Sequence, residues 1–578
     1  MIPRIETPAI EFYDTTLRDG AQTVGVKYTV AEKRSIIASL DRLGVDFIEC
    51  GWPGANPTDN VLLQDPPMVH RSELVAFGMT RRKGNTAAND PTIRALTEAK
   101  VPNVCLVGKS SSCHVQHALN GTSRQDNLDM IVDSIGYLKQ RKKKVFLDAE
   151  HFFDGYKQDR DFTLSCALKA YEAGAEKVVL CDTNGGILPS EVSEILVDVA
   201  RVLPLEAVGV HFHNDLGLAD AASLLAAQAG VGQIQGTIAG LGERCGNANL
   251  STLLPLVAFK SRVPTNVRKE MLTVLPEITN DVALKAGVKV GQSAPFVGEN
   301  AFTHKAGLHA SAVGKDGSLY EHIDPRNVGR SSKTTLSSQA GLSNLRIYLK
   351  RLGVSACQND GRLQVILDEI KQRECDGENV ELNTGSIDLL IAQNLFDVDL
   401  PLTPKVFDVR DTADASGRDS RANVELFVGK CRRTVRASAS GIGSVDALSN
   451  AMESALAQEF PDIPKFSLLD YSADIGAEAM GSRSRVQVQL KALSTGTDTW
   501  QVVATSSDIL TATWDAFIIC ANRHLVFQQL RKSAAQVGAQ KAESAFLRAP
   551  CSGGCNELLA SKFEDKTKRA MEKGTVNA

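Results

Sequence analysis

Long apolar stretches are missing from this sequence: no uninterrupted run approaches the roughly 20 residues that a membrane-spanning helix needs. An excess of charge of one sign is missing too, because 64 Lys and Arg residues face 68 Asp and Glu residues, which gives a net charge of −4. We therefore expect neither a membrane nor a nucleic acid as a partner. The first residues, MIPRIETPAIE, lack the apolar segment of a signal peptide, so no export or organelle signal is expected.

A paired cysteine framework is also lacking. The 12 cysteines are scattered along 578 residues, a pattern typical of reduced thiols, and it predicts a cytoplasmic protein. Cys551 and Cys555 form a lone CxxxC pair near the end of the sequence. We interpret this spacing as incidental, with a metal site or a disulfide as the alternative.

What the chain does contain is a regular alternation of strand-like and helix-like segments. With 578 residues it is too long for one hydrophobic core, so several domains are expected. Over residues 1–264 about eight strand–helix units follow one another, which is the rhythm of a (β/α)8 TIM barrel. A doubly wound open sheet is the competing architecture, but the only candidate for its glycine-rich turn, residues 230–236, is badly spaced. The expected strands are a run ending at Asp14 and residues 45–50, 73–79, 103–107, 145–149, 177–181, 207–213 and 233–238.

Polar residues gather where these expected strands end, on the face that carries the active site of such a barrel. The first strand leads into Asp14, Arg18 and Asp19, and the seventh ends in His211 and His213. Alternate residues of a strand point to one face, so both imidazoles can reach one ion; a structural, hydrogen-bonded pair is the alternative. Two histidines and a carboxylate suit a divalent Lewis acid, but they are also the ligands of non-haem iron oxygenases.

Several longer motifs make the pattern specific. Residues 12–22 (FYDTTLRDGAQ), 211–215 (HFHND) and 240–247 (GLGERCGN) together resemble the acyl-transferring metallolyases, which include isopropylmalate, homocitrate and citramalate synthases and the hydroxymethylglutaryl-CoA lyases. Residues 51–57 (GWPGANP), 148–156 (DAEHFFDGY) and 304–324 are similar to the citramalate synthase branch. The loop GERxGN is similar to that of the synthases rather than the lyases, so Cys245 is interpreted as a bystander.

The resemblance implies a divalent metal ion, Mn²⁺, Mg²⁺ or Zn²⁺, with acetyl-CoA as co-substrate. Asp19, His211 and His213 match the family's metal ligands, and Asn247 matches a further, weaker one. Asp14 is then structural, although the residues alone do not separate it from Asp19.

The resemblance also assigns the reacting groups. Arg18 matches the arginine that binds the keto oxygen of the substrate, and Thr183 matches the residue that holds its carboxylate. Glu150 matches an active-site glutamate. His309 and Tyr320 match a histidine and a tyrosine that come from beyond the barrel, often from the partner subunit, and we expect His309 to transfer the proton.

Three functions remain open on the sequence. The first is condensation of acetyl-CoA with pyruvate to give (R)-citramalate for isoleucine biosynthesis. The second keeps the chemistry with a longer 2-oxo acid, as in 2-isopropylmalate synthase. The third is a non-catalytic metal- or amino-acid-sensing protein on the same scaffold.

The rest of the chain is expected to regulate the barrel. Residues 265–400 resemble the linker that covers a partner's active site, and residues 401–530 read as an α+β allosteric domain in which 441–447 (GIGSVDA) is similar to a GxGPVDA turn. A polar tail, 531–578, follows. By resemblance we expect isoleucine as an effector and a homodimer or a higher homo-oligomer.

Overall fold

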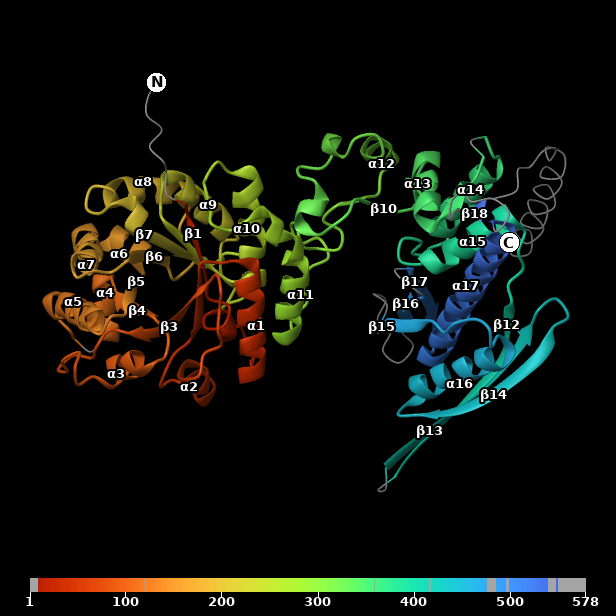
Figure 1. Ribbon diagram of the computed structural model, residues 1–578, viewed down its shortest axis with the longest axis horizontal. Helices are drawn as coiled ribbons and strands as arrows, with labels where there is room; N and C mark the ends of the chain where they lie inside the picture. Colours follow the sequence, from red (N-terminus) through yellow and green to blue (C-terminus); the bar gives the residue numbers. More distant parts are fainter. Residues whose placement is uncertain are drawn as a thin grey trace, which may run out of the picture. The chain divides into compact units, whose positions relative to one another are not determined.

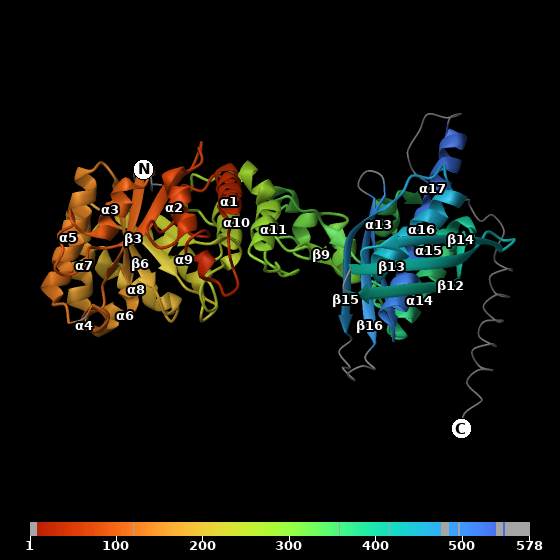
Figure 2. The same cartoon turned by 90° about the horizontal axis from the view of Figure 1, so that it is seen from below.

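The computed structural model describes residues 9–119, 121–357, 359–414, 417–475, 485–494, 498–538 and 547–548. The chain divides into two compact units, one comprising residues 1–303 and 321–333 and the other 304–320 and 334–578. Figures 1 and 2 show both units from two sides. Each unit is described by itself below.

The first unit is a closed barrel of eight parallel strands, as the sequence predicts. The strands follow chain order, and the barrel closes where β1 pairs with β8, with Glu11 opposite Gln233 and Asp14 opposite Gly236. All strands therefore end at the same rim. They are β1 (Glu11–Asp14), β2 (Phe47–Gly51), β3 (Glu73–Met79), β4 (Asn103–Lys109), β5 (Lys144–Glu150), β6 (Lys177–Asp182), β7 (Val208–Phe212) and β8 (Gln233–Gly236).

Helices surround the barrel (Figure 1). The first of them, α1 (Val30–Leu43), begins at a capping box of Thr29 with Glu32 and ends at Gly44 in the left-handed conformation. The other helices are α2 (Pro57–Gln64), α3 (Pro91–Glu98), α4 (Ser112–Ala118), α5 (Arg124–Gln140), α6 (Phe152–Gln158), α7 (Arg160–Glu172), α8 (Pro189–Val199), α9 (Ala219–Ala229), α10 (Leu250–Lys260) and α11 (Leu275–Lys285), with short 3-10 turns η1 (Gly20–Gln22), η2 (Leu205–Ala207), η3 (Ile238–Gly240), η4 (Lys269–Val274) and η6 (Pro325–Val328).

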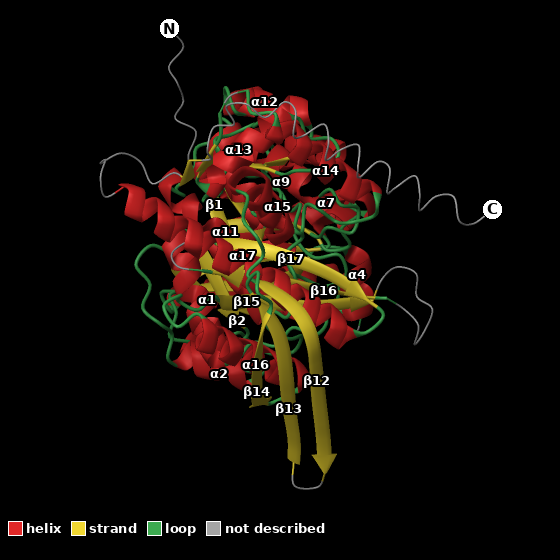
Figure 3. Cartoon of the chain, turned by 90° about the vertical axis from the view of Figure 1, so that its right-hand side faces the viewer, coloured by secondary structure: helices red, strands yellow, loops and turns green. Residues whose placement is uncertain are grey.

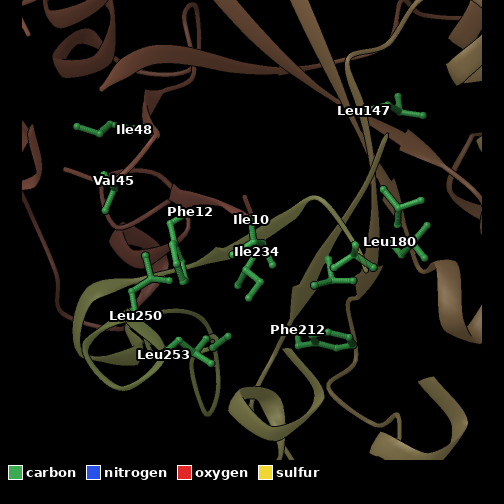
Figure 4. Close-up of a cluster of buried hydrophobic side chains, with 14 of the residues drawn as sticks. Ile10, Phe12, Val45, Ile48, Leu147, Leu180, Phe212, Ile234, Leu250 and Leu253 are labelled. Carbon is green, nitrogen blue, oxygen red and sulfur yellow. The ribbon is translucent and has the colours of Figure 1, made fainter. Parts of the chain in front are cut away.

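Two hydrophobic layers hold this unit together, because successive residues of a strand face opposite sides. Phe12 on β1 belongs to the large core between the strands and the helices; Figure 4 shows it with Leu250 and Leu253 of α10. Its neighbour Tyr13 belongs to a smaller cluster with Phe146, and their ring centroids lie 5.9 Å apart. These two packed layers hold the strands in place, so the carboxyl ends of the strands can carry polar groups at fixed positions.

The second unit combines helices with two antiparallel three-stranded sheets, β12-β13-β14 and β15-β16-β17 (Figure 3). The sequence pattern also predicts strands at 422–428 and 485–490 and a helix at 444–456. The first strand lies in β13, the second corresponds to β16 from Val486 onward, and the helix lies in α16. Cys551 and Cys555 lie outside the described residues. The elements are α12 (Gly307–Val313), η5 (Gly317–Leu319), α13 (Leu342–Leu352), β11 (Val354–Ser355), α14 (Arg362–Cys375), α15 (Thr384–Phe396), β12 (Leu402–Asp414), β13 (Gly417–Val428), β14 (Arg433–Gly441), α16 (Ser444–Glu459), β15 (Ser467–Ile475), β16 (Val486–Leu493), β17 (Thr499–Ser506), α17 (Ile509–Gly538) and β18 (Leu547–Arg548); β9 (Thr303–His304) and β10 (Lys333–Thr334) lie where the chain passes between units.

A buried arginine ties helices of the second unit to a sheet. Arg523 on α17 is 1% exposed, and it donates to Asp388 on α15 at 2.9 Å and to Asp498, which precedes β17, at 2.7 and 2.8 Å. Its guanidinium carbon also lies 4.4 Å from the ring centroid of Trp500. Removing one partner of a buried ion pair leaves the other charge uncompensated.

We expect Arg523→Leu to lower the free energy of unfolding of this unit by about 3–5 kcal/mol, since the buried Asp388 would lose its guanidinium partner while Asp498 would keep its ion pair with Arg531. Urea unfolding followed by tryptophan fluorescence measures this loss. Arg410→Leu is the control, because Arg410 is exposed and pairs with Asp408 at the surface, at 3.4 Å; it should change the free energy by about 0.5 kcal/mol or less. Equal stability of both variants would contradict the role given to Arg523.

Two general features complete the fold. Nine cysteines within the described residues, those other than Cys357, are free thiols. Among the described residues, we find no helix with the length and apolar character needed to cross a membrane.

Candidate active site

Three predicted ligands meet at the carboxyl ends of the barrel strands. Asp19 lies in the turn after β1, His211 on β7 and His213 just beyond it. The Asp19 Oδ2 atom lies 3.3 Å from Nε2 of His211 and 3.9 Å from Nε2 of His213, and the two Nε2 atoms are 3.4 Å apart. All three side chains are buried. The structure thus joins residues nearly 200 positions apart in one cluster.

The charges of this cluster suit metal ligands. Burial opposes ionisation of Asp19, but Arg18 and the two histidines outweigh it and hold its pKa below the usual range. Burial and the neighbouring His211 lower the pKa of His213 to about 4. Burial also disfavours the charged form of His211, but the hydrogen bond and charge of Asp19 raise its pKa overall. Near neutral pH, Asp19 is therefore a carboxylate and His213 a neutral imidazole, which are the forms that bind a metal.

Asn247 is held beside these ligands by a glycine-rich loop. It forms an isolated β-bridge with His213, and its Nδ2 donates to the carbonyl of Leu241 at 2.9 Å. A Cβ on Gly246 would lie 1.9 Å from the Gly240 carbonyl oxygen, so the GLGERCGN turn requires glycine there. The Oδ1 atom of Asn247 is buried without a hydrogen-bond partner among the described residues. An oxygen donor left unpaired beside two imidazoles and a carboxylate fits a divalent ion.

Asp14 does not join the cluster of Asp19. Its two carboxylate oxygens accept from the backbone N–H and the hydroxyl of Thr16, at 2.9 and 2.8 Å. Burial raises the pKa of Asp14 to about 7, against the hydrogen bonds from Thr16. The structure therefore separates the two aspartates that the residues alone left equal.

Arg18 is fixed between a carboxylate and an aromatic ring. Its Nε donates to Glu49, its Nη1 lies 3.5 Å from Oδ2 of Asp19, and its guanidinium carbon lies 3.8 Å from the ring centroid of Phe77. Glu49 also accepts hydrogen bonds from Tyr13 and, at 2.8 Å, from Thr15. This arrangement places a cation beside the ligand cluster, where it can stabilise negative charge on an oxygen.

Thr183 and Glu150 lie at the ends of neighbouring strands. The Thr183 hydroxyl accepts from the backbone N–H of His151 at 2.8 Å, so its own proton is free for another acceptor. His151 adopts a left-handed conformation with φ 57°, and its ring stacks on that of His114 at 3.6 Å between centroids. Glu150 forms an ion pair with Lys109. Sequence reasoning missed Lys109, His114 and the role of the His151 backbone, because no spacing links them to the motifs.

His309 and Tyr320 belong to the second unit, whereas the ligand cluster belongs to the first. The structure brings these two side chains together: their ring centroids lie 4.2 Å apart. Tyr320 is 42% exposed, which leaves it free to contact a ligand or a partner.

An eight-stranded barrel with two histidines and a carboxylate at its carboxyl rim is the arrangement of the metal-dependent TIM-barrel enzymes. The HMGL-like family matches residues 9–279, the homocitrate synthase post-HMGL domain-like family matches 296–377, and the LeuA allosteric (dimerisation) domain matches 382–525.

Curated relatives refine this class. An (R)-citramalate synthase from Aquifex aeolicus is 38% identical over 88% of this chain and 96% of its own length. Another from Sulfolobus acidocaldarius is 36% identical over 91% and 99%. A probable 2-isopropylmalate synthase from Methanopyrus kandleri is 30% identical over 89% and 98%. The chain belongs to the (R)-citramalate synthase family, as the motifs predicted.

Proposed function

We propose that this protein condenses acetyl-CoA with pyruvate, giving (R)-citramalate and CoA for isoleucine biosynthesis. The observation that carries the proposal is the convergence of Asp19, His211 and His213 within 3.9 Å at the barrel rim. The relatives named (R)-citramalate synthase support the choice of pyruvate.

Asp19, His211 and His213, with Asn247 as a further ligand, would hold the divalent ion, for which we propose Mn²⁺, Mg²⁺ or Zn²⁺. When bound, that ion supplies Lewis-acid polarisation of the 2-oxo acid. Arg18 donates to the keto oxygen as it becomes an alkoxide.

Thr183 and Glu150 complete the substrate site. The Thr183 hydroxyl, which already accepts from His151, donates its proton to the substrate carboxylate. Glu150, held by Lys109 at the end of β5, serves as an acceptor for substrate or water protons.

Proton transfer from acetyl-CoA is assigned to His309. A neutral imidazole has a lone pair that can take a proton from the acetyl methyl group, directly or through a water. The resulting enolate carbon bonds to the keto carbon, the keto oxygen gains a proton, and water cleaves the thioester to release CoA. Tyr320, whose ring lies 4.2 Å from that of His309, orients this base.

For the remainder of the chain we propose a catalytic barrel over residues 1–264, a linker over 265–400 that contributes to the active site, an allosteric domain over 401–530 and a polar tail over 531–578. The match of 382–525 to the LeuA allosteric (dimerisation) domain supports a homodimer or a higher homo-oligomer under feedback control. We propose isoleucine as the effector, and a cytoplasmic location.

A thiol-release assay over a panel of 2-oxo acids tests the function. With acetyl-CoA, we expect pyruvate to be turned over at least ~10-fold faster than 2-oxoisovalerate, because a pocket that fits a methyl group discriminates against added carbons by this order. Chelation of divalent ions should reduce CoA release to background, and restoring them should recover it.

Two other outcomes would overturn the proposal. Faster turnover of 2-oxoisovalerate would favour a 2-isopropylmalate synthase, the activity named for the relative that is 30% identical. Failure to release CoA with any 2-oxo acid, in the presence of each ion, would favour a non-catalytic sensing protein.

A further inference from the structure

A buried series of hydrogen bonds leads from His211 through Gln235 to Asp148 inside the barrel. The Nδ1 atom of His211 on β7 lies 2.9 Å from Oε1 of Gln235 on β8, and Nε2 of Gln235 donates to Oδ1 of Asp148 on β5 at 3.0 Å. Exposed fractions are 4%, 0% and 4% for His211, Gln235 and Asp148. Side chains from three strands thus form one buried hydrogen-bonded connection.

In this series of hydrogen bonds, each group donates to the next one in the direction from His211 to Asp148. An ionised carboxylate can only accept, so Asp148 draws the amide N–H of Gln235 and turns Oε1 toward the imidazole. That oxygen in turn requires a proton on Nδ1 of His211. When the imidazole is neutral, as a metal ligand must be, its lone pair is then on Nε2, the atom that lies 3.3 Å from Asp19 and 3.4 Å from His213.

His213 is held differently. Its Nδ1 atom is buried without a hydrogen-bond partner among the described residues. Its place is set instead by the backbone, through the β-bridge to Asn247. Of the two imidazoles, His211 is therefore the one whose tautomer is imposed by neighbouring side chains.

A second metal site is the competing interpretation of this region, because side-chain atoms of Glu49, Cys105 and Asp148 lie within 4.8 Å of one another. The carboxylate of Glu49 already has three donors. It accepts from Tyr13, Thr15 and Arg18. A cation there would lie beside the positive guanidinium of Arg18, so we interpret these buried carboxylates as groups that organise neighbouring side chains.

We propose that Gln235 and Asp148 are positioning residues, which fix the tautomer and the orientation of His211 so that its Nε2 faces the ion. The inference rests on the proposed metal site and deepens it. The amide of Gln235 lies between Asp148 and His211, so the negative charge of Asp148 does not contact the imidazole directly. His211 thereby has a hydrogen-bond acceptor for Nδ1–H without a second carboxylate beside Asp19.

Metal affinity of the full chain tests this role, with Mn²⁺ as the probe. Free Mn²⁺ is measured by electron paramagnetic resonance while the metal-stripped protein is titrated. Losing the partner of a histidine ligand costs about 10–100-fold in metal affinity, so we expect this loss for Gln235→Leu. Gln235→Glu keeps an acceptor for Nδ1–H and can share a proton with Asp148, so its affinity should return to within ~3-fold of the unaltered protein.

Gln233 provides a matched control. It lies two residues earlier on β8, points to the same side of the strand and is 0% exposed, but its Nε2 donates to Glu11 at 3.3 Å rather than facing a histidine. Gln233→Leu removes the same buried amide and should leave Mn²⁺ affinity within ~3-fold. Circular dichroism confirms that each variant is folded.

The outcomes separate the inference from the function on which it rests. If the unaltered protein binds no Mn²⁺, the proposed metal site itself fails. If it binds Mn²⁺ and Gln235→Leu binds equally well, the positioning role is wrong. Equal losses in Gln235→Leu, Gln235→Glu and Gln233→Leu would overturn it too, because they would reflect packing alone.

Discussion

Replacing Asp19 with alanine is expected to reduce kcat/KM for acetyl-CoA and pyruvate by about 10³-fold or more. Among the described residues, Asp19 is the carboxylate that forms one group with both His211 and His213, at 3.3 and 3.9 Å. The charge stabilisation that a bound ion supplies is several kcal/mol, and each ~1.4 kcal/mol is a factor of ten in rate. CoA release at saturating Mn²⁺ measures the loss, and the Mn²⁺ titration should show weakened binding.

Asp14→Asn is the natural control for this substitution. Asp14 is buried in the same motif, but its oxygens accept from the backbone N–H and the hydroxyl of Thr16, and among the described residues it is not part of the group of Asp19, His211 and His213. An amide oxygen can still accept the Thr16 N–H, so Mn²⁺ affinity should stay within ~3-fold. Loss of Mn²⁺ binding in Asp14→Asn with retention in Asp19→Ala would reverse the assignment of the two aspartates.

Replacing Arg18 with glutamine is expected to lower kcat by about 10²–10³-fold while Mn²⁺ binding is retained, because in the proposed mechanism Arg18 stabilises developing charge and is not a ligand. Its position is held by Glu49, which accepts from Nε, and by Phe77, whose ring centroid lies 3.8 Å from the guanidinium carbon. Arg18→Lys keeps the charge but not the planar fork, so it should recover only part of the rate.

An exposed arginine gives the comparison for Arg18. Arg34 pairs with Asp65 on the surface of the same unit, at 2.7 Å. Arg34→Gln removes the same charge and should leave kcat unchanged. A full rate in Arg18→Gln, or a loss of Mn²⁺ binding that accounts for its lower rate, would contradict a direct role in charge stabilisation.

The barrel could be predicted because its signals are local. Short apolar runs and helical periodicity are readable within about 15 residues: the helical spacing of apolar residues predicts a helix over 30–43, and α1 spans these residues. The position of His211 and His213 on one face follows from the period of two in a strand. Boundaries differed slightly: β7 ends at Phe212 rather than at residue 213, since His213 already pairs with Asn247 outside the barrel sheet.

The candidate site was only partly predictable. The motifs placed Asp19, Arg18 and both histidines at strand ends, and their resemblance to a family supplied roles. They gave no reason to select Gln235, because QIQG reads as an ordinary buried strand. Its contact with His211 depends on the register of β7 with β8, where His211 lies opposite Gln235.

The sequence by itself determined a barrel, a rim rich in carboxylates and imidazoles, and the kinship with acyl-transferring synthases, because strand period, turn glycines and contiguous motifs are properties of neighbouring residues. Tertiary structure alone decided that Asp19 and not Asp14 meets the histidines, and that Asp148 reaches His211 through Gln235. Those choices depend on which strands lie side by side and on which donors remain unpaired in a buried space. Side-chain hydrogen bonds across a closed sheet depend on the register of its strands. That register cannot be determined from any single stretch of the sequence.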